Sequence, residues 1–458
     1  MKRLLLQFCI LLLPFTFFGS HNTFAAEQAA ELTAGCVFTT SQNSSDVWAL
    51  KDGNRATRYC SSGETDIKLT NEQPFKSLYI IWDTPPQPWM LAAEQGSLPF
   101  GSYGFIHEFI ELQSPQNTVT LTVNNDKNTI CDIYVFAEGE LPAWVQRWQP
   151  PYQDADMLLL PTHADDEHLF FGGTMPHYAG EKGLKVQVAY LTNHWAEPYR
   201  PHELLDGLWE VGITAYPVIS GFADRYAGSL EQAQRLYKQE DVMAYQVEQL
   251  RRFKPEVVVG HDVNGEYGHG VHIYNTLTLQ KALERSSDPT QYPSSAQQYG
   301  VWDVPKTYLH LYDKNTMLMD WNIPLKHFGG KSAIEMAKQG FAKHVSQQKY
   351  FTVEDYGPYD CRKFGLYRTT VGPDVIGGDF FENICFEVPE SQPVSVEEQL
   401  EIKKPETTPT AKEIQENADD KIIGKPSAWV ALLACLAAGL TTGAATILAY
   451  RKSRKPKH

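Results

Sequence analysis

The chain has 458 residues, of which 42% are hydrophobic and 21% charged, and its formal net charge is -15. This length exceeds one ordinary domain and fits two with accessory segments, and the composition is typical of globular protein. The acidic balance argues against a nucleic-acid partner, because binding to a phosphate backbone requires clustered Lys and Arg.

The N-terminus has the pattern of a secretory signal. Met1, Lys2 and Arg3 precede an apolar run at residues 4–18, and a more polar stretch then leads to Ala25, after which cleavage is expected. A membrane anchor is the alternative, but the run is short for a span of about 20 residues. We therefore expect residues 1–25 to be a signal peptide and the body of the chain to be exported.

The C-terminal region has the pattern of a membrane anchor. Residues 428–450 contain no charged residue, which suits a helix that crosses a bilayer, and the basic tail at 451–458 marks the cytoplasmic side. A buried core helix is the alternative. Residues 388–425 are rich in Glu, Lys, Pro and Thr, so we expect a disordered stalk. Together these segments predict a single-pass type I protein of the cell membrane.

Export permits disulfide bonds among the cysteines of the body. Cys36 with Cys60 and Cys361 with Cys385 are one set of pairs, which leaves Cys131 unpaired. Cys36 with Cys131 is an equal alternative, because connectivity does not follow from sequence.

Residues 27–142 show short strand patterns separated by turn residues. Runs at 77–82, 118–123 and 133–136 are bounded by Asp, Asn, Gly and Pro, which is typical of an all-β sandwich. The segment 45–59, with its DG and TRY runs, resembles the early part of discoidin-like, galactose-binding-fold domains. That resemblance implies glycan docking as a hypothesis, and a purely structural sandwich is the alternative.

Strand and helix patterns alternate from residue 152 to 387. Apolar runs at 157–160, 185–191 and 256–260 predict strands buried on both faces, and helical periods occur at 202–212, 229–253 and 269–283. This alternation predicts an α/β domain with a Rossmann-like, doubly wound, mostly parallel sheet. Ligands of such sheets bind at the carboxyl ends of the strands.

Candidate metal ligands follow two of these strands. His163, Asp165 and Asp166 come directly after the first strand, and His269 and His272 share one face at a helix start. Three protein ligands with an open fourth position form the pattern of a catalytic zinc site, and a remaining carboxylate can act on water. Each group alone is a weak signal, but both follow buried strands of the same predicted sheet.

The two groups lie in motifs that resemble a known family. The run PTHADDE at 161–167 resembles the PHPDDE-type motif of the LmbE-like (PIG-L) N-acetylglucosaminyl deacetylase family, and NGEYGHGVH at 264–272 resembles its second motif. The runs RPHEL at 200–204 and HVSQ at 344–347 are similar to supporting elements of that family. The resemblance covers residues 154–387.

The resemblance implies a role for each of five residues. It implies zinc ligation by His163, Asp166 and His272, with another divalent metal as an alternative. It also implies that Asp165 is the general base that activates water. His269 would be the protonated group that stabilises the oxyanion and hands a proton to the leaving amine.

Other residues near the motifs carry weaker signals. Arg200 and Asp224 align with substrate-contacting positions of the family, against surface salt bridges as the alternative. His261 and Asp262 close the third strand, where a supporting role is favoured over ligation. For His194, at another strand end, a structural role is favoured.

The chain departs from the family pattern at positions that are not ligands. Thr162 and Ala164 flank the first histidine, and Gly270-Val271 stands where Pro-Asp is frequent, which leaves the orientation of the second pair of histidines open. Tyr267 is a candidate pocket residue, and Glu266 is expected to orient backbone or a ligand.

These patterns predict a zinc-dependent hydrolase that removes N-acetyl groups from amino sugars of a cell-surface glycan or glycolipid. The expected partners are an N-acetylated carbohydrate and the membrane. An amidase acting on another extracellular amide is one alternative, and a non-catalytic surface glycan-binding protein is another.

Overall fold

The computed structural model describes residues 27–42, 45–60, 63–123 and 128–386 of the chain. The expected signal peptide, stalk, membrane-spanning segment and basic tail all lie outside these residues. Within the described ranges, no helix combines the length and the apolar character that a bilayer crossing requires.

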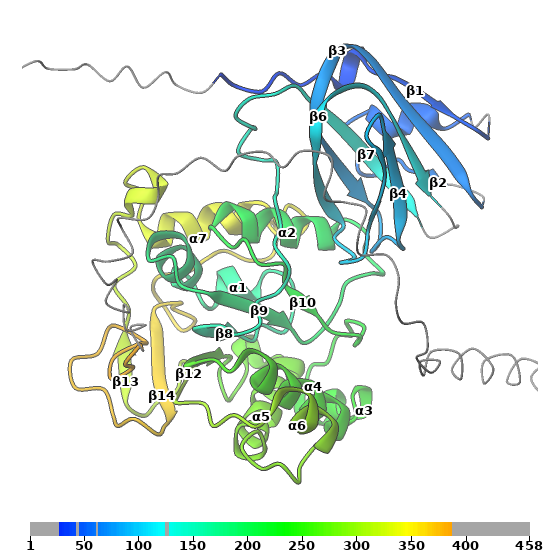
Figure 1. Ribbon diagram of the computed structural model, residues 1–458. Coiled ribbons are helices and arrows are strands. Elements are labelled where there is room, and N and C mark those ends of the chain that lie inside the picture. The colour runs from blue at the N-terminus through cyan, green and yellow to red at the C-terminus, as the bar shows by residue number, and fades with distance from the viewer. Residues whose placement is uncertain (1–26, 43–44, 61–62, 124–127, 387–458) are drawn as a thin grey trace, which may run out of the picture. The chain divides into compact units, whose positions relative to one another are not determined.

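The N-terminal part is a seven-stranded, antiparallel sheet with the order β2-β7-β3-β6-β4-β5, in which β1 also pairs with β3 (Figure 1). Bulges interrupt the pairing of β3 with β6 between Thr70 and Ser77, and they divide these two long strands. The all-β sandwich predicted for this region is confirmed. The strands are β1 (Val37–Thr40), β2 (Tyr59–Cys60), β3 (Thr65–Trp82), β4 (Trp89–Ala93), β5 (Gly96–Phe100), β6 (His107–Val123) and β7 (Thr129–Phe136), and the short 3-10 helices are η1 (Thr33–Gly35) and η2 (Val47–Lys51).

The second part is an α/β domain around another seven-stranded sheet, with the order β10-β9-β8-β11-β12-β14-β13. The first five strands are parallel, and β14 runs antiparallel to its neighbours β12 and β13, which confirms the mostly parallel sheet predicted from the alternating pattern. The strands are β8 (Met157–Leu159), β9 (Val186–Tyr190), β10 (Val218–Ile219), β11 (Val257–Gly260), β12 (Lys306–His310), β13 (Thr316–Leu318) and β14 (Lys363–Thr369).

Helices cover both faces of this sheet because successive residues of its central strands are all apolar. Met157 and Leu159 of β8 pack in one cluster with Leu205 of α2, whereas Leu158 packs in another with Val247 of α4. The sheet is therefore doubly wound. The helices are α1 (Asp166–Leu169), α2 (Arg200–Glu210), α3 (Leu230–Leu236), α4 (Gln239–Phe253), α5 (Gly270–Arg285), α6 (Pro293–Tyr299) and α7 (Ala333–Ala342), with shorter turns η3 (Pro176–Glu181), η4 (Glu266–Gly268) and η5 (Lys326–Phe328).

The strand order places a crevice between β8 and β11. The chain passes from β8 to β9 and β10 on one side, and then returns to place β11 and β12 on the other side of β8. Connections that leave two neighbouring strands in opposite directions open a crevice at their carboxyl ends, where ligands of doubly wound sheets bind. Both histidine-bearing motifs follow these two strands.

The prediction of one continuous helix at 229–253 is wrong, because the structure has two helices there. Tyr237 is extended (φ -127°, ψ 131°) between α3 and α4. Its carbonyl accepts a hydrogen bond from the Tyr274 hydroxyl at 3.1 Å instead of a helical amide, and its ring packs against Phe222. A tertiary contact therefore overrides a continuous helical period.

The described cysteines are not paired. Cys36, Cys60, Cys131, Cys361 and Cys385 are all free thiols in this structure, so neither proposed pairing scheme is present. The sulfur of Cys36 instead accepts a hydrogen bond from the side-chain amide of Asn71 at 3.4 Å.

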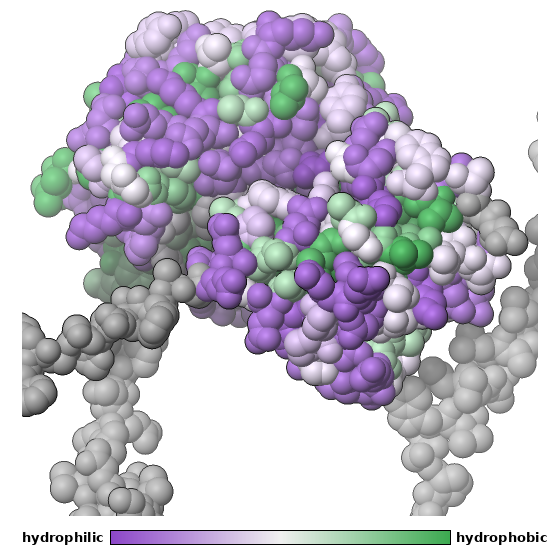
Figure 2. Space-filling model, turned by 90° about the horizontal axis from the view of Figure 1, so that it is seen from above, coloured by the Kyte–Doolittle hydropathy of each residue, from purple (hydrophilic) through white to green (hydrophobic). Residues whose placement is uncertain are grey.

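The face of the molecule seen in Figure 2 is mainly hydrophilic, with apolar residues scattered among polar ones. Scattered apolar residues are normal on soluble domains, and a large continuous apolar patch would mark a binding surface. The site described next is therefore identified by its chemistry and its pocket.

Candidate functional site

The loop after β8 is held in a strained conformation at Asp165. This residue has φ 118° and ψ -30°, a region that residues with a side chain rarely adopt. Its amide donates to Glu167 Oε2 at 2.8 Å, and the Arg200 guanidinium donates to the carbonyl of Ala164 beside it. The turn sends the side chains of Asp165 and Asp166 to different neighbours.

Three side chains from the two motifs converge on one point. His163 Nδ1 lies 3.1 Å from Asp166 Oδ2 and 3.0 Å from His272 Nε2, and the last two atoms are 3.3 Å apart. Ligands at 2.0–2.1 Å from a tetrahedral zinc ion are themselves about 3.3 Å apart. Two imidazoles and a carboxylate at these separations fit the donor set of a zinc site. The structure thus brings together the three predicted metal ligands.

A buried carboxylate supports this group from behind. Glu266 accepts from Nδ1 of His272 and of His261, both at 2.9 Å, and from Nδ1 of His310 at 2.7 Å. A carboxylate on the remote nitrogen fixes the tautomer and orientation of a ligating histidine. Glu266 therefore holds His272 with Nε2 aimed at Asp166.

The first histidine is supported in the same way by Asp224. His163 Nε2 lies 3.4 Å from Asp224 Oδ1, and Asp224 Oδ2 lies 3.4 Å from His194 Nδ1. His194 in turn accepts from the amide of Ala164 at 3.1 Å. Burial opposes ionisation of Asp224, but its hydrogen bond with His163 lowers its pKa to about 2. Asp224, predicted to contact substrate, is thus also in contact with His163.

The electrostatics of the group favour a bound cation. Burial would raise the pKa of the Asp166 carboxyl, but His272 and His163 hold it well below its usual range. Burial likewise opposes protonation of His163, yet Asp166 raises its pKa to about 9. An ionised buried carboxylate that keeps its neighbours protonated is a site where a metal ion can replace those protons.

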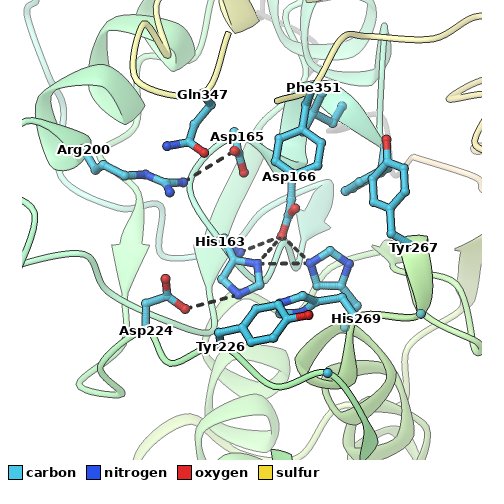
Figure 3. A pocket seen from close by; sticks show the side chains of 15 residues that line it. His163, Asp165, Asp166, Arg200, Asp224, Tyr226, Tyr267, His269, Gln347 and Phe351 are labelled. Atoms are coloured by element: carbon cyan, nitrogen blue, oxygen red, sulfur yellow. Dashed lines mark hydrogen bonds and ion pairs between the residues drawn. The ribbon is translucent and has the colours of Figure 1, made fainter. Parts of the chain in front are cut away.

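Asp165 remains outside this group. It is 5% exposed, and its Oδ2 lies 3.5 Å from Arg200 Nη2. Burial, followed by the charge of Asp166, raises the pKa of Asp165 to about 7. Figure 3 shows Arg200 pointing toward Asp165, with Asp166 directed instead at His163. Arg200, predicted to contact substrate, thus also faces the expected base.

His269 lies on the opposite side from Asp165 and has a free ring nitrogen. Its Nδ1 is buried and has no hydrogen-bond partner, and its ring meets that of His163 edge-on at 4.9 Å between centroids. Burial, and then the charges of His163 and His272, lower the pKa of His269 to about 3. The protonated form that the resemblance implies for His269 stays a prediction.

These residues line a pocket of about 330 Å³. Aromatic rings form part of its wall: Tyr226 is 81% exposed and lies 5.4 Å from the ring of His269, and Tyr267 packs on Phe351. The lining residues are His163, Asp165, Asp166, Leu169, Phe170, Arg200, Asp224, Tyr226, Gly228, Tyr267, Gly268, His269, His272, Gln347 and Phe351. All seven residues predicted for the site are among them.

Several residues of the site lie beyond the sequence prediction. Tyr226 and Phe351 carry no pattern that marks them, and His310 reaches Glu266 from β12 only through the fold. Glu266 lies in the second family-like motif, and this motif is the sequence feature behind the expectation that it orients backbone or a ligand. His261 is a neighbour of Asp166 at 3.4 Å and also a hydrogen-bond donor to Glu266, which agrees with the favoured supporting role.

Comparisons with known proteins agree with the motifs. The chain is 30% identical over 190 residues to a 1D-myo-inositol 2-acetamido-2-deoxy-alpha-D-glucopyranoside deacetylase of Streptomyces scabiei, a match that covers 35% of this chain and 57% of that protein. The chain thus spans little more than half the length of this curated relative. This similarity confirms the resemblance to N-acetylglucosaminyl deacetylases over about a third of the chain. No protein-family model matches the chain.

Two solved structures are similar to part of the chain. N,N'-diacetylchitobiose deacetylase from Pyrococcus horikoshii is 18% identical, with a TM-score of 0.33, over 44% of this chain and 73% of that one. The module CBM32-3 from a family 31 glycoside hydrolase of Clostridium perfringens is 9% identical, with a TM-score of 0.17, over 24% of this chain and 95% of that one.

Proposed function

We propose that this protein is a metal-dependent hydrolase that removes N-acetyl groups from amino sugars of the N-acetylglucosamine type. The observation that carries the proposal is the meeting of His163, Asp166 and His272 at 3.0–3.3 Å, with the separate carboxylate of Asp165 in the same pocket. The curated relative acts on a 2-acetamido sugar, which supports the choice of amide.

His163, Asp166 and His272 would hold the metal, and zinc is the ion that their donor atoms fit. When bound, zinc polarises an amide carbonyl and makes water more acidic. Glu266 and Asp224 keep the two imidazoles in the tautomer that aims a lone pair at that point. The metal site is therefore built by hydrogen bonds as well as by ligands.

Asp165 would accept the proton of the attacking water. Its carboxylate lies outside the triad, and a pKa of about 7 suits a base that must gain and release a proton near neutral pH. Arg200 beside it favours the ionised form and fixes its position. The proton accepted by Asp165 is then available for the leaving amine.

His269 would stabilise the charge that develops on the former carbonyl oxygen. An imidazole N–H can donate its hydrogen to an oxyanion. His269 lines the pocket, and its ring lies beside that of His163. A base and an oxyanion donor that line one pocket suit hydrolysis of an amide.

Acetate release by the purified full chain, loaded with zinc, from a panel of N-acetylated glycans tests the proposal. The Asp165→Ala variant should lose turnover and keep its metal, and His272→Ala should lose the metal. A chain without stoichiometric metal that releases no acetate from any N-acetylglucosamine conjugate would contradict it. Release of a different carboxylic acid from other amides would instead favour an amidase that acts on amides other than N-acetyl groups.

The sequence outside the described residues supports a location for this activity. We propose that the enzyme acts outside the cell, held at the membrane by the span at 428–450 and the stalk at 388–425. The sandwich would then bring the pocket to a surface glycan. Binding of the protein to a glycan array should persist in the Asp165→Ala variant, and absence of any binding would leave the sandwich a structural role.

A further inference from the structure

A second cluster of metal-ligand side chains lies beside the pocket, outside its lining. Glu167 and His168 belong to α1, and His344 follows α7. All three side chains are fully buried, and their ligand atoms lie within 4.8 Å of one another. None of the three contributes to the wall of the pocket.

The separations in this cluster match those of the first. Glu167 Oε1 lies 3.1 Å from His344 Nε2 and 3.3 Å from His168 Nε2. Ligands of one tetrahedral zinc ion are about 3.3 Å apart, as calculated from bonds of 2.0–2.1 Å. One carboxylate oxygen and two imidazole nitrogens thus supply the same donor types as the triad at the pocket, and both distances from the carboxylate are in the same range.

Hydrogen bonds within the protein leave this cluster incomplete. Both ring nitrogens of His168 are buried without a hydrogen-bond partner, and so is Nδ1 of His344. A buried polar atom without a partner destabilises the folded protein. The other oxygen of Glu167 already accepts from the amide of Asp165, so Oε1 is the oxygen that faces the two rings. A cation shared by the three side chains would give a partner to Nε2 of His168, which makes no hydrogen bond in the protein.

Two glycines make room for the rings. A Cβ on Gly207 of α2 would lie 2.7 Å from His168 Nε2 and 2.9 Å from His344 Nε2. A Cβ on Gly340 of α7 would lie 2.6 Å from His168 Nδ1. The two Nε2 atoms therefore converge on the space that Gly207 leaves open, and any larger residue there would fill it.

We propose that Glu167, His168 and His344 bind a second divalent cation, with zinc the ion that their donor atoms fit. The three side chains supply two imidazoles and one carboxylate, which are zinc ligands, and all three are closed to solvent. Such an ion would join α1 to the segment after α7 and hold the carboxylate that supports the strained amide of Asp165. This inference does not rest on the proposed function, because metal binding here needs no substrate.

Metal content of the purified full chain after loading with zinc tests the inference. The unaltered chain should hold two zinc ions, and His168→Val and His272→Ala should each hold one. X-ray absorption at the zinc edge of His272→Ala should show two imidazole ligands. His177→Val is the matched control, because His177 also has a buried nitrogen without a partner but belongs to no such cluster, and it should keep both ions.

One zinc ion in the unaltered chain, lost in His272→Ala and kept in His168→Val, would overturn the inference and leave a hydrogen-bonded His–Glu–His group. Loss of an ion in His168→Val alone, with no change in His272→Ala, would contradict the proposed function and support the second site. If His168→Val does not fold, anomalous diffraction from the unaltered chain decides. A zinc peak should lie within bonding distance of Glu167, His168 and His344, and its absence would overturn the inference.

Discussion

Two neighbouring carboxylates have separate environments in this site. Asp166 faces histidines and Asp165 faces Arg200, and the backbone of Asp165, with φ 118°, makes this division possible. The same two environments move their pKa values in opposite directions, with that of Asp166 lowered and that of Asp165 raised to about 7. Such a division is typical of sites in which one carboxylate binds and the other transfers a proton.

Replacing the base tests this division. Asp165→Asn should lower kcat for deacetylation by about 10²–10⁴-fold, the contribution typical of a general base, because an amide cannot accept the proton. Metal content should not change, since Asp165 lies outside the triad. Acetate release and metal analysis measure the two effects. Asp154→Asn, an exposed residue paired with Lys185, is the control, and an Asp165→Asn enzyme within tenfold of the unaltered one would contradict the role.

Glu266 should contribute to metal affinity although it is not itself a proposed ligand. The Glu266→Gln substitution replaces one carboxylate oxygen with an NH2 group. The side chain can then no longer accept hydrogen bonds from all three histidines. Metal affinity should fall by about 10–100-fold, the usual effect of losing a carboxylate behind a ligand. Competition with a zinc-sensitive dye measures it. Glu284→Gln on the exposed side of α5 should leave the affinity unchanged, and equal affinities in the two variants would refute the prediction.

At the scale of single residues, the site residues that belong to motifs could be predicted from the sequence. Those outside the motifs could not. His163, Asp166 and His272 stand in two runs with metal-ligand chemistry. Tyr226 lies on a loop without a pattern, and His310 lies within a strand. Their place in the site follows from the packing of β12 and of the loops, which no local pattern encodes.

At the scale of elements, the start of α5 explains one departure from the family pattern. Gly270 follows His269, and its amide donates to the carbonyl of Ala227 at 2.8 Å. A Cβ at this position would overlap the carbonyl oxygen of Ser229. The loop at 227–229 thus packs directly on the helix start that carries both histidines, and only glycine leaves room for it.

Gly270→Ala should therefore displace the start of α5 from that loop. We expect a lower Tm and weaker metal binding, because His272 would move relative to His163 and Asp166. Calorimetry and metal titration measure these effects. Gly221→Ala is the control, since no atom lies within 4 Å of its added Cβ, and it should behave as the unaltered chain. Unchanged metal affinity in Gly270→Ala would show that the loop adjusts.

Elements with strong periodicity were predictable and those held by single polar contacts were not. The predicted strands at 157–160 and 256–260 correspond to β8 and β11, and both are continuous apolar runs. β12 instead begins with Lys306, which is buried because its ammonium group pairs with Asp374 at 2.5 Å. A lysine in the sequence does not indicate a buried strand, because its burial depends on an ion-pair partner that the sequence does not reveal.

At the scale of the whole described body, the sandwich and the α/β domain belong to one compact unit that ends at Phe386. A buried chain of hydrogen bonds joins them: Tyr79 and His107 Nδ1 are 2.6 Å apart, and His107 Nε2 and His202 Nδ1 of α2 are 2.8 Å apart. Arg55 of the sandwich also pairs with Asp206 of α2 at 2.7 Å. These contacts were not predictable from sequence, because they join side chains far apart in the chain.

The two histidines of this contact should make stability depend on pH. Burial, then Arg55 and Arg58, lower the pKa of His202 to about 3, and burial, then Arg55, holds that of His107 well below its usual range. The unfolded chain therefore binds more protons than the folded chain between the unfolded pKa of about 6.5 and the folded values. Their contribution to stability is complete above pH 6.5 and is lost as the pH falls.

Calorimetry between pH 7.5 and 4.5 measures this loss as a falling Tm. The metal ligands also gain protons in acid, so the comparison of variants isolates the contribution of this contact. His202→Gln retains an acceptor for the His107 N–H and cannot be protonated, so its Tm should fall less steeply than that of the unaltered chain. His327→Gln makes the same change at a side chain that is 70% exposed and should leave the slope unchanged. Equal slopes for His202→Gln and the unaltered chain would show that this contact tolerates the charge, and acid lability would then originate at the metal ligands.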